Sequence, residues 1–172
     1  PRISVLVARF KDSLMDRNFR AYLIGRIISA CGFSILPFIA VHFASESGGG
    51  LKAGVIVSSG AAMTAGMAVG SLILGRLGDR YGHRLGILIG TAVQIVTLGV
   101  LLFVTGVPAC ILAYFGAGVC ALGGWVSHAN IVLETCPHDH RVAHISVGNL
   151  AIGGAAAIMP LVAGIVVAQW SP

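Results

Sequence analysis

A few polar side chains interrupt the long apolar stretches of this chain, and they are the groups that could do chemistry. Ser127, Asn130 and Glu134 follow one another at spacings of three and four residues, so a helix would place them on one face. His128 would lie about 100° around the same helix. Polar groups inside a bilayer are costly and are functional candidates by default. His128 could act as a proton-linked switch, with a hydrogen-bonded structural role as the alternative.

A second polar set lies in the apolar stretch nearest the N-terminus. It contains Arg26, Ser34 and His42, and Pro37 predicts a bend between the last two. The alternative for Arg26, as for Glu134, is that the charged group reaches back to the membrane surface near the end of its helix.

A histidine-rich cluster follows Cys136 in a polar segment. It consists of His138, Asp139, His140 and His144, and the last two are one turn apart if a helix begins early. Side chains of these types can bind a metal ion. The sequence offers no second pair of ligands elsewhere, so we predict neither a metal site nor a cofactor.

Catalytic motifs are missing from the sequence. It contains no G-x-S-x-G elbow, no H-E-x-x-H motif, no P-loop and no dinucleotide fingerprint. No two of the four cysteines have C-x-x-C spacing. We therefore expect no disulfide and no redox role for them. We therefore predict that the protein is not an enzyme. A membrane-embedded enzyme built on the histidine-rich cluster is the alternative.

The composition indicates a membrane protein. Hydrophobic residues make up 56% of the chain and charged residues 10%, whereas a soluble domain carries about 25% charge. The mean hydropathy is +0.93. So few charges cannot cover a water-exposed surface of this size, and lipid is the expected solvent. The net charge of +5 does not indicate nucleic-acid binding, because the basic residues flank the apolar stretches.

Five apolar stretches are long enough to cross a bilayer, which takes roughly 20 residues in a helix. They are continuous rather than alternating, which excludes the strands of a β-barrel. We expect an all-α, polytopic transmembrane helix bundle with short connections. The five expected helices cover about residues 21–44, 53–74, 85–105, 108–133 and 142–170.

The basic residues predict how the chain crosses the membrane. Ten of the eleven lysines and arginines fall on one side of the expected spans, and only Lys52 falls on the other. Basic loops stay in the cytoplasm, so we expect residues 1–20 to form a basic cytoplasmic segment with the N-terminus inside. The protein would be integral to a bacterial-type inner or plasma membrane, in contact with its lipid bilayer.

The segment between the second and third spans carries a distinctive pattern. Residues 75–84 read G-R-L-G-D-R-Y-G-H-R, which predicts a tight loop at the membrane surface. Its three glycines would allow a sharp reversal and a close backbone approach. Asp79 could pair with Arg80 or Arg84, or lie at the positive end of a neighbouring helix. An ordinary cytoplasmic loop would explain the arginines, but neither the acidic residue nor the glycine spacing.

The spacing within residues 75–84 resembles the G-x-x-x-D-R-x-G-x-R signature loop of the major facilitator superfamily of transporters. The matching positions are Gly75, Asp79, Arg80, Gly82 and Arg84. The resemblance implies that this loop latches one half of a transporter against the other in the outward-open state. His83 stands where the family usually has arginine or lysine, which implies a contact that is lost or depends on pH.

The same resemblance implies a fold and a function. Each half of a facilitator has six helices, so five spans would be part of one half, with the remaining half of the same transporter as partner. The implied function is secondary active transport of a small solute by alternating access. The solute stays open, as does proton coupling. The junction of the fourth and fifth spans is more similar to that of a C-terminal half. A non-transporting membrane scaffold or assembly protein is the alternative.

In this family the first and fourth helices of each half line the substrate cavity. The resemblance therefore implies that Arg26, Ser34, His128 and Asn130 are cavity-lining residues.

Small residues recur at four-residue spacing in the second expected span. They are Ala62, Gly66 and Gly70, and this spacing predicts a flat stripe for helix–helix contact.

Overall fold

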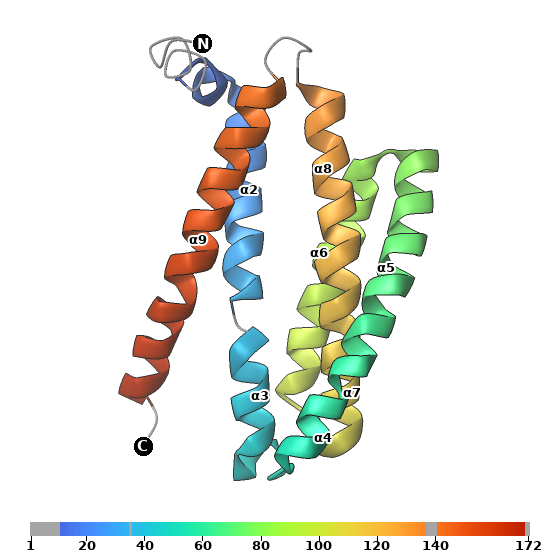
Figure 1. The fold of residues 1–172 in the computed structure, drawn as a ribbon, viewed down its shortest axis with the longest axis vertical. Helices are drawn as coiled ribbons and strands as arrows, with labels where there is room; N and C mark the ends of the chain where they lie inside the picture. Colours follow the sequence, from blue (N-terminus) through green and yellow to red (C-terminus); the bar gives the residue numbers. More distant parts are fainter. Residues whose placement is uncertain (1–10, 35, 137–140, 171–172) are drawn as a thin grey trace. The chain divides into compact units, whose positions relative to one another are not determined.

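The computed structural model describes residues 11–34, 36–136 and 141–170, and within these ranges the chain forms helices and no strand (Figure 1). Five helical stretches of the described residues are long and apolar enough to cross a membrane, which confirms the predicted all-α, polytopic fold. They are Arg17–Ala44, Ala53–Tyr81, His83–Leu101, Gly106–Glu134 and Arg141–Gln169.

The chain divides into two compact units. One comprises residues 1–35 with 132–172 and contains α2 (Arg17–Phe33) and α9 (Arg141–Trp170). The other comprises residues 36–131. It contains α3 (Leu36–Ala44), the 3₁₀ turn η1 (Glu46–Gly48), α4 (Ala53–Ser58), α5 (Gly60–Tyr81), α6 (His83–Leu101), α7 (Gly106–Gly118), the π-helical turn η2 (Val119–Gly123) and most of α8 (Gly124–Thr135).

The first span begins earlier than its apolar run. The Asp16 carboxylate accepts hydrogen bonds from the backbone N–H groups of Asn18 and Phe19, at 2.8 and 3.2 Å. This cap satisfies two of the N–H groups that every helix start leaves open. The helix therefore starts at Arg17 rather than at residue 21.

The first helix ends before Pro37, and the bend predicted there stays a prediction. α2 ends at Phe33 and α3 begins at Leu36. Pro37 has no N–H to donate to the carbonyl four residues earlier, so a continuous helix would lose a hydrogen bond here. The Ser34 hydroxyl instead donates to the Cys31 carbonyl at the end of α2.

The unit of α2 and α9 is held by packing between these two helices. α9 runs through Pro160 without interruption, which membrane helices tolerate. In its most apolar window none of the residues is buried. This window of α9 therefore presents apolar surface to its surroundings.

The fourth span, made of α7, η2 and α8, is the most enclosed of the five. Its most apolar window is 44% buried, against 22% or less in the others. Glycines on the second span let the fourth span approach it closely, as the small-residue stripe predicted. Gly66 and Gly70 are buried, and a Cβ atom on Gly70 would lie 2.5 Å from the Val119 carbonyl oxygen.

The third span packs on the fourth through a row of small and polar side chains. Thr97 of α6 lies against Gly116, and Gly86 of α6 lies against the Ser127 hydroxyl. Between them the Cys120 thiol donates to the Gly90 carbonyl at 3.3 Å. The π-helical turn η2 lies in the middle of this contact, and no signal in the sequence predicted it.

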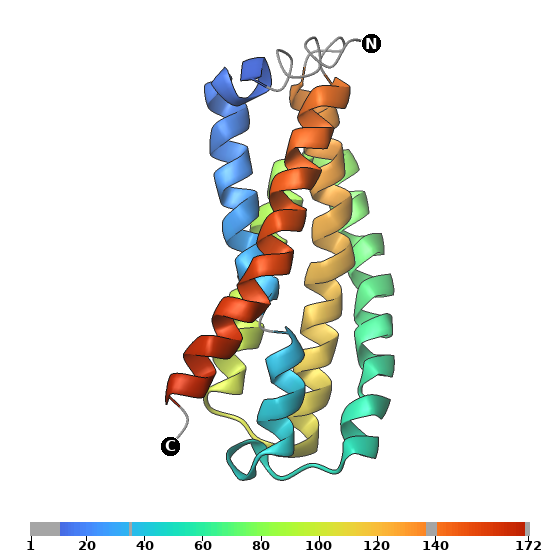
Figure 2. The same cartoon turned by 60° about the vertical axis from the view of Figure 1, so that its left-hand side comes forward.

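An apolar core closes the end of this unit where α3, α4 and the beginning of α7 meet. Ile39 and Phe43 of α3, Ile56 of α4, and Ala109 and Cys110 of α7 are buried together. Figure 2 shows α3 beside the beginning of α7 at this end. The core ties the connection between the first two spans to the start of the fourth.

Candidate functional site

The candidate site with the clearest geometry is the turn between α5 and α6. We expected a ten-residue loop at residues 75–84, and this expectation was wrong. α5 continues to Tyr81 and α6 begins at His83, so Gly82 alone lies outside the helices. The second span was predicted to end at residue 74 and the third to begin at residue 85, and both helices are longer at this turn. Their backbone N–H groups continue to donate to carbonyl groups four residues earlier.

Gly82 makes the reversal. Its φ of 87° and ψ of 145° lie in a region that is almost restricted to glycine. Its N–H donates to the Gly78 carbonyl at 2.8 Å, and its own carbonyl accepts from the Leu85 N–H at 3.2 Å. These two bonds close α5 and open α6 across one residue.

The other two glycines of the pattern have different roles. Gly78 is buried, and a Cβ atom there would overlap the His83 imidazole ring. Gly78 therefore allows a close approach rather than a turn. A Cβ atom on Gly75 would meet no atom of the described residues within 4 Å, so nothing in these residues explains that glycine.

Asp79 has a partner that the sequence analysis did not name. Its Oδ1 atom lies 4.0 Å from Nε2 of His83, four residues further along the chain at the beginning of α6. The Asp79 side chain is 79% exposed, whereas that of His83 is 6% exposed. At 4.0 Å this contact is longer than a hydrogen bond, so the exposed Asp79 carboxylate remains open to a further partner.

The arginines of the signature pattern face outward. Arg80 and Arg84 are both exposed, and the Arg80 guanidinium carbon lies 5.4 Å from the centre of the Tyr81 ring. A cation over an aromatic face is held in place weakly, by about 0.5–1 kcal/mol at an exposed site. Arg80 therefore presents an exposed positive charge at the end of α5.

The polar groups of α8 differ in burial. Ser127 is fully buried and His128 is 9% exposed, whereas Asn130 is half-buried and Glu134 is exposed. The Ser127 hydroxyl has no hydrogen-bond partner among the described residues. It contacts the Gly86 backbone of α6 instead, a contact that spacing along one helix could not predict.

Arg26 and Ser34 lie in the other unit. Arg26 is 8% exposed, on a face of α2 that also buries Phe19, Leu23 and Ala30. Ser34 is buried and its hydroxyl bonds the Cys31 carbonyl. Arg26 and Ser34 thus belong to one unit, and His128 and Asn130 to the other. Their common cavity stays a prediction.

Of the histidine-rich cluster, only His144 lies within the described residues. It is buried, and its Nδ1 atom is 3.2 Å from the Ser13 hydroxyl. Its ring meets the edge of Phe19 at 4.5 Å between centroids. His138, Asp139 and His140 lie outside the described residues, so the metal alternative stays untested. Within residues 11–34, 36–136 and 141–170 no three potential ligands gather at one point.

Comparison with known proteins identifies the family. No curated protein and no solved structure matches the chain. A family model does match, over residues 22–172, which include all five spans except the first turn of the first. It describes the Major Facilitator Superfamily, whose members are membrane transporters and not enzymes. The chain therefore belongs to the Major Facilitator Superfamily, as the spacing in residues 75–84 predicted.

Proposed function

We propose that the protein is a secondary active transporter that moves a small solute across an inner or plasma membrane by alternating access. Family membership and the five apolar spans support this proposal. In such transporters two helical bundles move about a binding site near the middle of the membrane. The remaining half of the same transporter is the proposed partner. The excess of basic residues on one side of the spans supports a cytoplasmic N-terminus.

The observation that carries the mechanism is the geometry of the α5–α6 turn. Gly82 confines the reversal to one residue, and Asp79 and Arg80 remain exposed at the end of α5. Charges held on a rigid helix end lose little freedom when they meet a partner, so they suit a contact that must form and break. We propose that they latch this bundle against the other half when the cytoplasmic side is closed.

The buried His83 sets the direction of the Asp79 carboxylate in this proposal. Nε2 of His83 occupies one side of the carboxylate, which leaves the other oxygen for a donor on the partner half. A contact that biases the two end states by about 1.4 kcal/mol changes their ratio tenfold. One charged hydrogen bond is sufficient for such a bias.

Replacement of the carboxylate tests the latch. In the full-length protein, reconstituted in liposomes, Asp79→Asn should shift the end-state populations toward the inward-open form by about tenfold and slow transport. Glu46→Gln is the matched control, because Glu46 is an exposed carboxylate on η1 at the other end of its unit. Unchanged populations and unchanged transport in Asp79→Asn would contradict the latch.

The substrate cavity is the second part of the proposal. We place Arg26, Ser34, His128 and Asn130 in it, because the first and fourth spans carry them. Cysteine substitutions at Ser34 and Asn130 test this part of the proposal. Both should react with a membrane-impermeant thiol reagent from one side of the membrane, and excess substrate should protect them. A non-transporting scaffold would leave both cysteines unreactive.

A further inference from the structure

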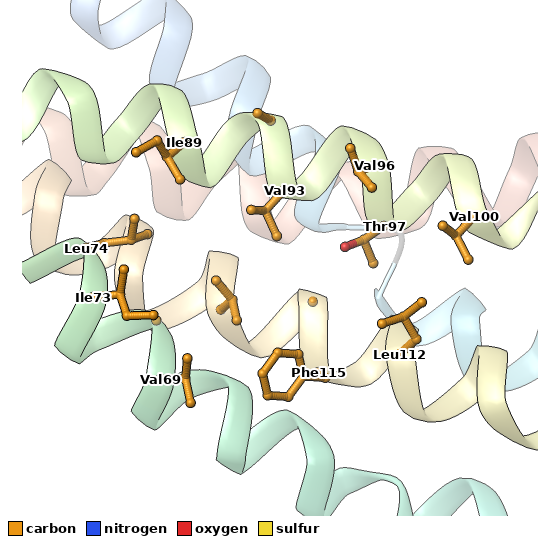
Figure 3. Close-up of a pocket in the computed structure, with 14 residues that line it drawn as sticks. Val69, Ile73, Leu74, Ile89, Val93, Val96, Thr97, Val100, Leu112 and Phe115 are labelled. Atoms are coloured by element: carbon orange, nitrogen blue, oxygen red, sulfur yellow. The ribbon is translucent and has the colours of Figure 1, made fainter. Parts of the chain in front are cut away.

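An apolar groove runs along one side of the unit formed by residues 36–131. It has a volume of about 570 Å³ and lies between α5, α6 and the α7–η2 segment. In Figure 3, Ile73 and Ile89 mark one end of the groove and Val100 and Leu112 mark the other. Thr97 has the only polar side chain among its lining residues, and that hydroxyl is turned toward Gly116.

The lining selects a hydrocarbon ligand. A sugar or a peptide would leave its hydroxyl or amide groups without partners in this groove, at a cost of several kcal/mol in a membrane. An empty groove would forfeit dispersion contacts along its walls. Val96 is 65% exposed and Leu112 is 51% exposed, so the groove is open at its rim, and in a membrane it would be accessible to lipid.

Two arginines extend the groove face of α5. Val69 and Ile73 line the groove, and Arg76 and Arg80 continue their row at spacings of three and four residues. Helical side chains lean toward the N-terminus of their helix, which is the direction of the groove from Arg76. The Arg80 guanidinium lies over the Tyr81 ring and would turn toward the groove to bind a headgroup. Arg76 lies about 4.5 Å along the axis beyond Ile73, and both arginines are exposed.

We propose that this groove binds one acyl chain of an anionic phospholipid, with the phosphate held by Arg76 and Arg80. The groove would hold the acyl chain and the arginines would bind the negatively charged phosphate, so the two features fit one phospholipid molecule. Arg76 is not a position of the signature pattern, and the latch gives it no role. The Arg76 contact therefore does not depend on the proposed transport function, whereas Arg80 is shared with the proposed latch.

The headgroup, and not the tail, should decide which lipid binds. Lipid tails are as apolar as the groove, so an acyl chain gains little by leaving the bilayer for it. Each arginine near the membrane surface favours an anionic lipid about fivefold. Phosphatidylglycerol should therefore outcompete phosphatidylcholine with the same tails by about 5- to 25-fold.

Photolabelling in nanodiscs tests the site with the full-length protein. The probes are phosphatidylglycerol and phosphatidylcholine with a diazirine in the middle of one acyl chain, and labelled residues are found by mass spectrometry. Label should appear on Val93, Val96 and Phe115, more strongly from phosphatidylglycerol. Label that avoids α6 and α7, or equal labelling by both lipids, would overturn the proposal.

Two substitutions separate the tail site from the headgroup site. Ala92→Trp fills the groove, which Ala92 lines, and should reduce labelling at least fivefold. Ala68→Trp is its control, because Ala68 is exposed on another face of α5 and should leave labelling unchanged. Arg76→Gln should lower the preference for phosphatidylglycerol about fivefold without abolishing labelling. An unchanged preference in Arg76→Gln, or full labelling in Ala92→Trp, would refute the assignment.

Discussion

Gly82 should be the least replaceable glycine of the signature segment. Its φ of 87° and ψ of 145° are open to glycine and strained for every L-amino acid, at about 1–3 kcal/mol. A Cβ atom at this position would meet no neighbour within 4 Å. The expected loss of stability in Gly82→Ala is therefore backbone strain alone, without a steric clash.

A second glycine provides the matched control. Gly99 lies within α6, and a Cβ atom there also has open space around it. Because its backbone is helical, Gly99→Ala should stabilise the protein by about 0.4–1 kcal/mol. The two substitutions make the same chemical change and should act in opposite directions, about 1.5 to 4 kcal/mol apart.

The free energy of unfolding of the full-length protein, measured by titration with SDS in mixed micelles, gives this difference directly. We expect Gly82→Ala to unfold at a lower SDS fraction than the wild type, and Gly99→Ala at an equal or higher fraction. Equal effects of the two substitutions, or a more stable Gly82→Ala, would refute the view that Gly82 alone makes the turn.

Three further predictions concern packing and transport. Gly78→Ala should destabilise the protein because of its overlap with the His83 ring, by about 1–3 kcal/mol. The double variant Gly78→Ala with His83→Ala should recover part of that loss, and simple additivity in a double-mutant cycle would contradict the contact. Gly70→Val should separate the second span from Val119, with a lower unfolding free energy and slower transport as the readouts. His128→Ala should alter the pH dependence of transport in liposomes, and wild-type kinetics from pH 5 to pH 8 would rule out His128 as a proton-linked switch.

The sequence was sufficient to predict the number of spans and the family. A membrane helix must satisfy its backbone hydrogen bonds internally and must match the thickness of the hydrocarbon core. Both requirements act on a contiguous stretch of about 20 residues, so they are visible without tertiary information. The signature spacing from Gly75 to Arg84 is equally local, and the family that it predicted is confirmed by the family match.

Local reasoning failed where a residue's neighbour lies far away in the chain. The glycines and charges of residues 75–84 were interpreted as a loop, yet the helices leave only Gly82 between them. Ser127 was grouped with Asn130 and Glu134 by spacing, but it is buried against Gly86. A helical period indicates which residues share a face, and it does not indicate what that face meets.

The sequence by itself thus determined that this chain is a bundle of membrane-spanning helices with a facilitator signature. The tertiary structure alone decided which glycine makes the turn, that the His83 ring packs against Gly78, and where the apolar groove opens. The physical reason is the separation along the chain of the residues that interact. Span length and charge bias are properties of consecutive residues, whereas close packing depends on atoms that only the folded chain brings together.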